Sequence, residues 1–125
     1  MSEAKNRILL IEDEEDIVEA LKMRLEGNGY EVIPALDGTD GLNKARTTAP
    51  DLIILDIMLP KLDGYKIARM LKFDEKFSMI PILMLTAKVQ PADAQKGKEA
   101  GADSYMTKPF KADELLTEIK RLIVK

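Results

Sequence analysis

The stretch Leu52-Ile53-Ile54-Leu55-Asp56 joins large aliphatic side chains directly to a carboxylate. A continuous apolar run of this length predicts a strand that is buried on both faces of a sheet. The same form, a short run that ends in a polar side chain, recurs at Ile8-Leu9-Leu10-Ile11 before Glu12-Asp13, at Ile82-Leu83-Met84-Leu85 before Thr86, and at Ser104-Tyr105-Met106-Thr107 before Lys108. Charged residues are seldom kept beside a buried strand unless they are paired or used. These strand ends therefore indicate a functional site.

Helical patterns separate the apolar runs. Four helices are predicted from apolar residues at helical spacing: Ile17, Val18, Leu21 and Leu25 before Gly27; Leu42, Ala45 and Ala49 in a helix from about Gly38 to Thr48; Ile67, Ala68 and Leu71 after Asp63; and Leu115, Leu116, Ile119, Leu122 and Ile123 from about Ala112. A further helix is expected from Pro91 to about Gly101; it contains Gly97 and should be the least stable one. A weaker strand at residues 30–35 completes the alternation. Alternating strands and helices predict an α/β fold, with a five-stranded parallel sheet and five helices on both of its faces. We expect a single domain at residues 1–125, with no output domain in this chain.

The composition limits the kinds of function. The chain has 19 basic and 22 acidic residues, a net charge of −3, so we expect no direct binding of nucleic acid. It has neither cysteine nor histidine, so a metal would be held by oxygen atoms, which favours Mg²⁺ or Ca²⁺. We find no signal peptide and no apolar run near the roughly 20 residues of a membrane span. A cytoplasmic protein without a membrane contact is the expectation.

The carboxyl ends of parallel strands lie at one edge of a sheet, where α/β proteins form their sites. That edge would gather the carboxylates of Glu12, Asp13 and Asp56, the hydroxyl of Thr86 and the ammonium of Lys108. Carboxylates about 4 Å apart repel by about 4 kcal/mol at an effective dielectric of ~20, so the three need a cation or a raised pKa. Mg²⁺ suits them, because it takes hard oxygen ligands and keeps waters that phosphate oxygens can replace. Each residue alone also has an ordinary structural explanation, and only their combination indicates a site.

The sequence resembles the receiver domains of two-component response regulators over essentially its whole length. The resemblance rests on the order and spacing of four motifs: Ile8 to Glu14, Leu55-Asp56-Ile57-Met58-Leu59-Pro60 with Asp63-Gly64, Leu85-Thr86-Ala87, and Ala100-Gly101-Ala102-Asp103 through Lys108-Pro109-Phe110. It implies a flavodoxin-like fold with the strand order 2-1-3-4-5. It also implies a signalling module that catalyses only its own phosphorylation and dephosphorylation, and not a conventional enzyme.

The resemblance assigns the chemistry of the acidic edge. It implies that Asp56 is the phosphoacceptor and that Asp13, Asp56 and the backbone carbonyl of Met58 bind Mg²⁺ directly. Glu12, which stands where the family more often has aspartate, would act mainly through a metal-bound water. A carboxylate nucleophile has no proton to lose, so the absence of histidine does not hinder this reaction.

The resemblance also assigns a switch. Thr86 would bind a phosphoryl oxygen, Lys108 would pair with Asp56 and then with the phosphoryl group, and Tyr105 would be the aromatic switch residue. The residues alone leave open that Tyr105 simply packs on the last helix. The implied phosphodonor is a histidine kinase or a phosphotransfer protein. The output surface would be the fourth helix, fifth strand and fifth helix, read by a downstream protein or by a C-terminal output domain missing here. Dimerisation on phosphorylation is left open.

Three other functions compete with this interpretation. A flavin carrier of the same fold needs a phosphate-binding loop after the first strand, but here the acidic residues 12–16 would repel phosphate unless a metal intervened. A phosphatase with an aspartyl nucleophile usually has a second acid two residues later, where this chain has Met58. A degenerate receiver that serves only as an interaction surface is the third alternative, and the intact acidic edge argues against it.

Overall fold

The computed structural model describes residues 5–57, 64–86, 98, 101–108 and 111–123. These residues form β1 (Arg7–Ile11), α1 (Glu15–Gly27), β2 (Glu31–Ala35), α2 (Gly38–Thr48), β3 (Leu52–Asp56), α3 (Gly64–Lys72), β4 (Ile82–Thr86), β5 (Ser104–Thr107) and α5 (Ala112–Ile123). The fourth predicted helix, between Pro91 and Gly101, lies outside the described residues except for Lys98 and Gly101, so the labels pass from α3 to α5.

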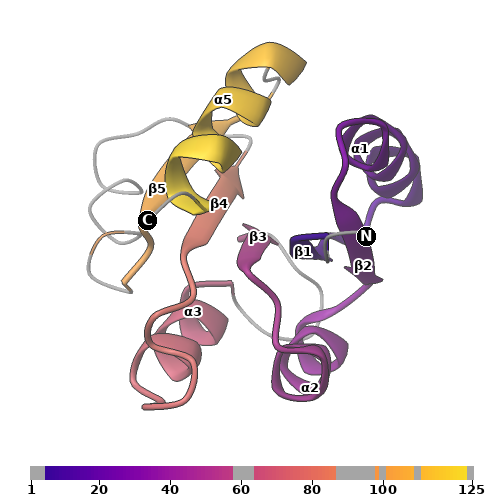
Figure 1. Cartoon of the computed structure of the whole chain (residues 1–125). Helices are drawn as coiled ribbons and strands as arrows, with labels where there is room; N and C mark the ends of the chain where they lie inside the picture. Colours follow the sequence, from indigo (N-terminus) through magenta and orange to yellow (C-terminus); the bar gives the residue numbers. More distant parts are fainter. Residues whose placement is uncertain (1–4, 58–63, 87–97, 99–100, 109–110, 124–125) are drawn as a thin grey trace.

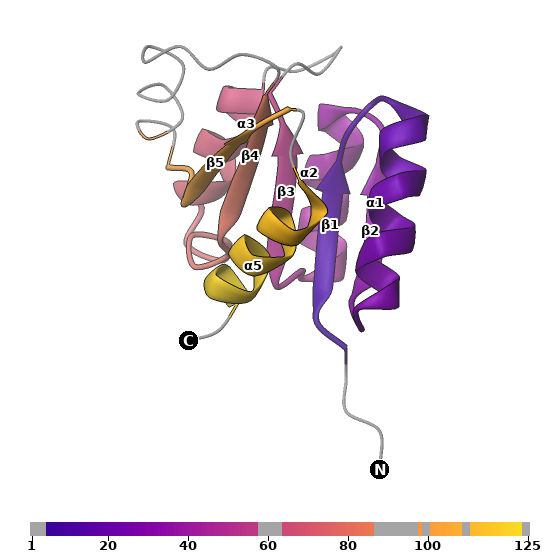
Figure 2. The same cartoon turned by 90° about the horizontal axis from the view of Figure 1, so that it is seen from above.

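The five strands form one parallel sheet in the order β2-β1-β3-β4-β5 (Figure 1). In register, Ile11 at the end of β1 lies opposite both Ala35 of β2 and Leu55 of β3. Asp56 lies opposite Leu85 of β4. The strands therefore run in one direction and finish at one edge (Figure 2). The predicted parallel sheet and the implied strand order are confirmed.

Helices cover both faces of the sheet. Figure 1 shows α1 and α5 on one face and α2 and α3 on the other. Along β1 the side chains alternate between the two cores: Ile8 and Leu10 pack under α1 and α5, whereas Leu9 and Ile11 pack under α2 and α3. All four side chains are fully buried. Burial on both faces is the physical reason for the unbroken apolar runs in the sequence.

In the four helices that the structure describes, the predicted apolar faces are confirmed with one exception. Leu115 and Ile119 of α5 are buried, and the other predicted apolar residues of that helix pack against the same core. Ala49, predicted on the apolar side of α2, is exposed and caps the helix in a left-handed conformation, with φ 49° and ψ 64°. The correction has a steric reason: Pro50 disfavours the helical conformation for the residue before it.

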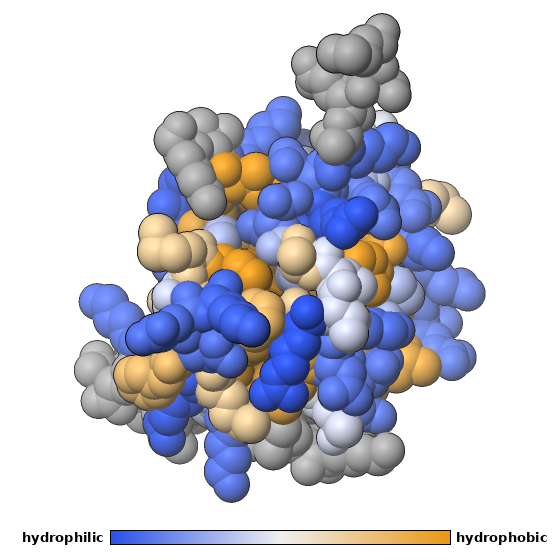
Figure 3. Space-filling view, turned by 60° about the horizontal axis from the view of Figure 1, so that its bottom comes forward, coloured by the Kyte–Doolittle hydropathy of each residue, from blue (hydrophilic) through white to orange (hydrophobic). Residues whose placement is uncertain are grey.

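The surface on the side of α2 and α3 is mostly hydrophilic, with separate apolar areas (Figure 3). Among the described residues, the most exposed large apolar side chains are Met23, Leu36, Met70, Phe73 and Met79. Scattered apolar side chains are usual on protein surfaces. No described helix is long and apolar enough to cross a membrane.

Candidate functional site

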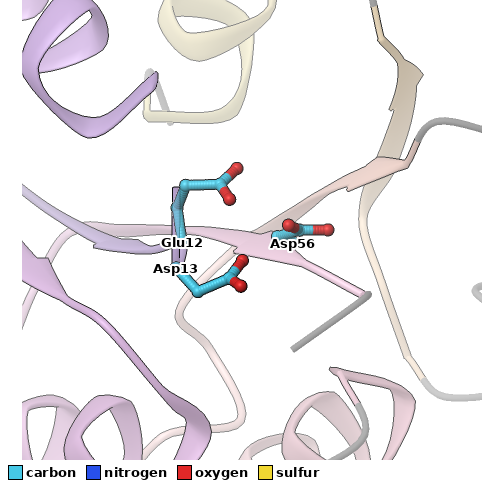
Figure 4. A group of neighbouring side chains, drawn as sticks. All are labelled: Glu12, Asp13 and Asp56. Carbon is cyan, nitrogen blue, oxygen red and sulfur yellow. The ribbon is translucent and has the colours of Figure 1, made fainter. Parts of the chain in front are cut away.

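Three carboxylates gather where β1 and β3 end (Figure 4). Glu12 and Asp13 directly follow β1, and Asp56 is the last residue of β3. One carboxylate oxygen from each lies within 4.8 Å of the others, a spacing that a single cation can bridge. Glu12 is fully buried and Asp56 is 4% exposed, whereas Asp13 is exposed and leaves the group open to solvent.

The backbone holds Glu12 in place at this edge. Its N–H donates to the carbonyl of Ala35 at 3.0 Å, which extends the β1–β2 pairing by one residue. Its carboxylate oxygen Oε2 accepts the backbone N–H of Glu14 at 3.2 Å. The first bond holds the backbone of Glu12 against β2, and the second holds its carboxylate against the turn that leads into α1.

Lys108 reaches this acidic group from the end of β5. Its Nζ donates to Glu12 Oε1 at 2.7 Å and to Asp56 Oδ2 at 3.3 Å. The lysine side chain is only 16% exposed. The ammonium thus lies between the two buried acids, and it already occupies the place from which it could contact a group attached to Asp56.

Burial and charge shift the pKa values of this cluster. Burial, more than the repulsion from Asp56, raises the pKa of Glu12 from 4.5 to about 7, although Lys108 opposes the shift. For Lys108, burial favours the neutral amine, but the hydrogen bonds and the attraction of Glu12 and Asp56 outweigh it and raise its pKa. The ammonium therefore stays charged at neutral pH.

We expect the cation-free protein to lose stability as the pH rises from about 5 to about 8. The folded pKa of Glu12 exceeds its ordinary value of 4.5, so in this window the folded state keeps a proton that the unfolded state has released. The loss is on the order of 3 kcal/mol, since one pKa unit corresponds to about 1.4 kcal/mol. Glu118 does not contribute, because its pKa is lowered to about 2 and its effect lies below this window.

Urea unfolding of the parent protein and of Glu12→Gln, at about pH 5 and at about pH 8, measures this effect. The glutamine variant should show a flat profile across the window, because it keeps the side-chain size and cannot ionise. Equal pH slopes in the parent and in Glu12→Gln would assign the effect to another group.

The structure describes the other predicted site residues, Thr86, Met58 and Tyr105, only in part. Thr86 ends β4 and lies opposite Thr107 in the β4–β5 pairing, so its backbone is at the same edge as Asp56. The threonine side chain and all of Met58, including its predicted carbonyl ligand, lie outside what the structure describes. Tyr105 is half-buried and packs against the core under α2 and α3. This core lies on the face of the sheet opposite to α5, and the role of Tyr105 as a switch residue stays a prediction.

Gly64 is a site-supporting residue that the sequence did not single out. It begins α3, and a Cβ built on it would lie 2.5 Å from the Cα of Ile57 and 2.9 Å from the carbonyl oxygen of Asp56. The helix can therefore approach the end of β3 only because this residue has no side chain. The only signal for Gly64 in the sequence analysis was its place in the Asp63-Gly64 motif.

Gly64→Ala should therefore destabilise the fold by about 1–3 kcal/mol, the usual cost of overpacking. The atoms in the way belong to the backbone and cannot rotate aside, so the strand end that carries Asp56 must move. Thermal or urea unfolding measures the loss. Gly27→Ala is the matched control, since nothing lies within 4 Å of its Cβ position. Equal stabilities of the two variants would contradict the close approach.

The sequence model of the response regulator receiver domain matches residues 8–120. The chain belongs to this family. It is a receiver domain of two-component signalling, with an acidic pocket formed by Glu12, Asp13 and Asp56, and not a conventional enzyme.

Individual relatives agree with this membership. The chain is 50% identical over 117 residues to the alkaline phosphatase synthesis transcriptional regulatory protein PhoP of Bacillus subtilis, covering 94% of this chain and 48% of PhoP. It is 44% identical over 117 residues to the DNA-binding regulator RpaA of Synechocystis, with 94% and 48% covered. The chain thus spans about half the length of these relatives.

Solved structures have the same fold. A putative response regulator from Chloroflexus aurantiacus superposes with a TM-score of 0.93 at 34% identity, covering 98% of this chain and all of that one. The receiver domain of the Pseudomonas aeruginosa sensor histidine kinase PA1611 superposes with a TM-score of 0.88 at 34% identity, with 96% and 98% covered. That structure has a magnesium ion coordinated in its active-site cleft.

Proposed function

We propose that Asp56 accepts a phosphoryl group in a Mg²⁺-dependent reaction. The observation that carries this proposal is the position of the Lys108 ammonium, 2.7 Å from Glu12 and 3.3 Å from Asp56, beside a group of three carboxylates. An acceptor carboxylate, an acidic cation site and a fixed positive charge are the parts that phosphoryl transfer requires. A degenerate receiver would not need to bury Lys108 against these acids.

The donor set fits Mg²⁺. When ionised, the three carboxylates and Lys108 leave an excess of two negative charges, which a divalent cation balances. Asp13 and Asp56 would hold the ion directly with the carbonyl of Met58, and Glu12 would act through a water. The magnesium-containing receiver domain of PA1611 supports this choice of metal. A bound Mg²⁺ would supply positive charge to the oxygens of the transferred phosphoryl group.

The residues of the chain then have distinct tasks. An oxygen of Asp56 attacks the phosphorus of a phosphohistidine or a small acyl phosphate, the bond to the leaving group breaks, and an acyl phosphate forms on Asp56. Lys108 moves its hydrogen bond from the carboxylate to a phosphoryl oxygen, and the hydroxyl of Thr86 donates to another. Tyr105 then changes its position beside β4. This rearrangement would alter the surface formed by the fourth helix, β5 and α5.

The family suggests the partners. The phosphodonor would be a histidine kinase or a phosphotransfer protein in the cytoplasm. Relatives such as RpaA are named as DNA-binding regulators of about twice this length, so an output domain or a separate output protein would receive the signal. Nucleic-acid binding would then belong to that output partner. Dimerisation on phosphorylation stays a prediction that size-exclusion chromatography with light scattering can measure.

Incubation with acetyl phosphate and Mg²⁺, followed by intact-mass measurement, tests the proposal. The protein should gain the mass of one phosphate, and chelation of the metal should prevent the gain. Beryllofluoride with Mg²⁺ should produce a stable mimic of the phosphorylated state. If neither acetyl phosphate nor a histidine kinase adds phosphate, the proposed function is wrong.

A further inference from the structure

Lys72 forms an ion pair at the end of the sheet opposite to the acidic site, with Asp103, whose side chain is 39% exposed. Lys72 is the last residue of α3, and its side chain is only 14% exposed. Its Nζ pairs with Asp103 Oδ2 at 2.8 Å and donates to the carbonyls of Ser78 at 3.1 Å and Ile80 at 2.7 Å. An ammonium has three hydrogens, so this lysine uses all of its donors within the protein.

Asp103, just before β5, connects this lysine to β4. The same oxygen that receives Lys72 also accepts the backbone N–H of Ile82 at 2.8 Å, and the Asp103 N–H donates to the carbonyl of Ile82 at 2.9 Å. Asp103 therefore contacts both backbone groups of the first residue of β4. Gly101 packs nearby with φ +96°, and a Cβ on it would lie 2.7 Å from Cγ of Lys72. These contacts thus join the end of α3, the start of β4 and the residue before β5.

The strand that starts at this point ends at the functional lysine. β5 spans Ser104–Thr107 at the edge of the sheet, pairs with β4 alone among the described strands, and is followed directly by Lys108. From Asp103 to Lys108 an extended chain covers about 16 Å. Because β5 links Asp103 directly to Lys108, a shift at the start of the strand would move Lys108 from its contacts of 2.7 Å and 3.3 Å.

We infer that Lys72 and Asp103 are positioning residues, whose ion pair fixes the register of β5 and so places the Lys108 ammonium against Glu12 and Asp56. The inference rests on the proposed function, because that function gives Lys108 its task at the phosphoryl group. The carboxylates that would hold Mg²⁺ lie at the ends of β1 and β3, whereas Asp103 of the pair is bonded to the start of β4. Loss of the pair should therefore slow phosphoryl transfer without weakening metal binding.

Lys72→Met tests this separation, because methionine keeps the length of the side chain and removes its charge and donors. The rate constant of phosphorylation by acetyl phosphate should fall about tenfold, as expected for a displaced reacting group. The dissociation constant for Mg²⁺ should not rise, because the carboxylates stay in place and a displaced ammonium repels the cation less. Lys66→Met is the matched control, since Lys66 is an exposed lysine of the same helix and should leave both values unchanged.

A second measurement observes Lys108 without any phosphorylation. In NMR spectra of the metal-free protein, the side-chain signals of Lys108 should move toward those of a free lysine in Lys72→Met. This signal does not depend on phosphate uptake. If the parent protein takes up no phosphate, the proposed function is wrong, but the NMR signals still show whether Lys72 positions Lys108.

Asp103→Asn provides an independent variant if Lys72→Met does not fold. It keeps an oxygen for the N–H of Ile82 and removes the charge that attracts Lys72, so it should show the same pattern with a smaller effect. An unchanged phosphorylation rate in folded variants would overturn the inference. Equal losses of phosphorylation and Mg²⁺ binding would also overturn it, since they would indicate general destabilisation.

Discussion

Asp56→Asn should take up no phosphate under conditions in which the parent protein gains one. Asparagine fills nearly the same space as aspartate, so the buried end of β3, where Asp56 is 4% exposed, can accommodate it. Its amide lacks the charged oxygen that attacks phosphorus, so no acyl phosphate can form. The variant also loses one of the three carboxylates, so its affinity for Mg²⁺ should fall. Intact mass after treatment with acetyl phosphate and Mg²⁺ measures the first effect, and a metal titration measures the second.

Asp16→Asn is the control for this experiment. Asp16 is exposed in the first turn of α1, close to the site in sequence and outside the carboxylate group, so its variant should gain phosphate like the parent. Phosphate uptake by Asp56→Asn would place the acceptor on another residue, and peptide mapping of the modified protein would then identify it.

Lys108→Met should change phosphorylation and metal binding in opposite directions. Removal of the ammonium takes away the charge expected to contact the phosphoryl group, and losses of about 100-fold or more in rate are typical when such a donor is removed. The same change removes a cation beside Glu12 and Asp56, so Mg²⁺ should bind more tightly. Without metal at about pH 8, the unpaired buried acids should cost about 3 kcal/mol or more of folding free energy.

Phosphorylation kinetics, a Mg²⁺ titration and urea unfolding measure these three effects. Lys111→Met, at an exposed lysine near the start of α5, should leave all of them unchanged. Weaker Mg²⁺ binding in Lys108→Met would show that the lysine supports the metal site, and the role given to it here would be wrong.

Much of the fold and the membership of the site could be predicted from the sequence. Residues inside a sheet that is covered on both faces must be apolar without a break, so β1, β3 and β4 are visible as runs. Parallel strands finish at one edge, so the polar residues after those runs are expected to meet there, and the carboxylates of Glu12 and Asp56 do.

The exceptions arise where neighbouring parts of the chain compete. Ala49 has the helical spacing of an apolar position, but the ring of Pro50 forces it out of the helix. Tyr105 could face either core by its pattern, and the register of β5 turns it toward α2 and α3.

The sequence by itself determined the strands, the four helices that the structure describes and the carboxylates at the acidic edge, because these follow from spacing and burial along a local stretch. Only the tertiary structure decided how those residues pair. Glu12 and Lys108 are 96 positions apart and meet at 2.7 Å. Lys72 reaches Asp103 across the opposite edge, and Gly64 lets α3 approach the end of β3. Such contacts depend on strand order, register and the approach of separate elements, and a linear pattern does not encode distances between them.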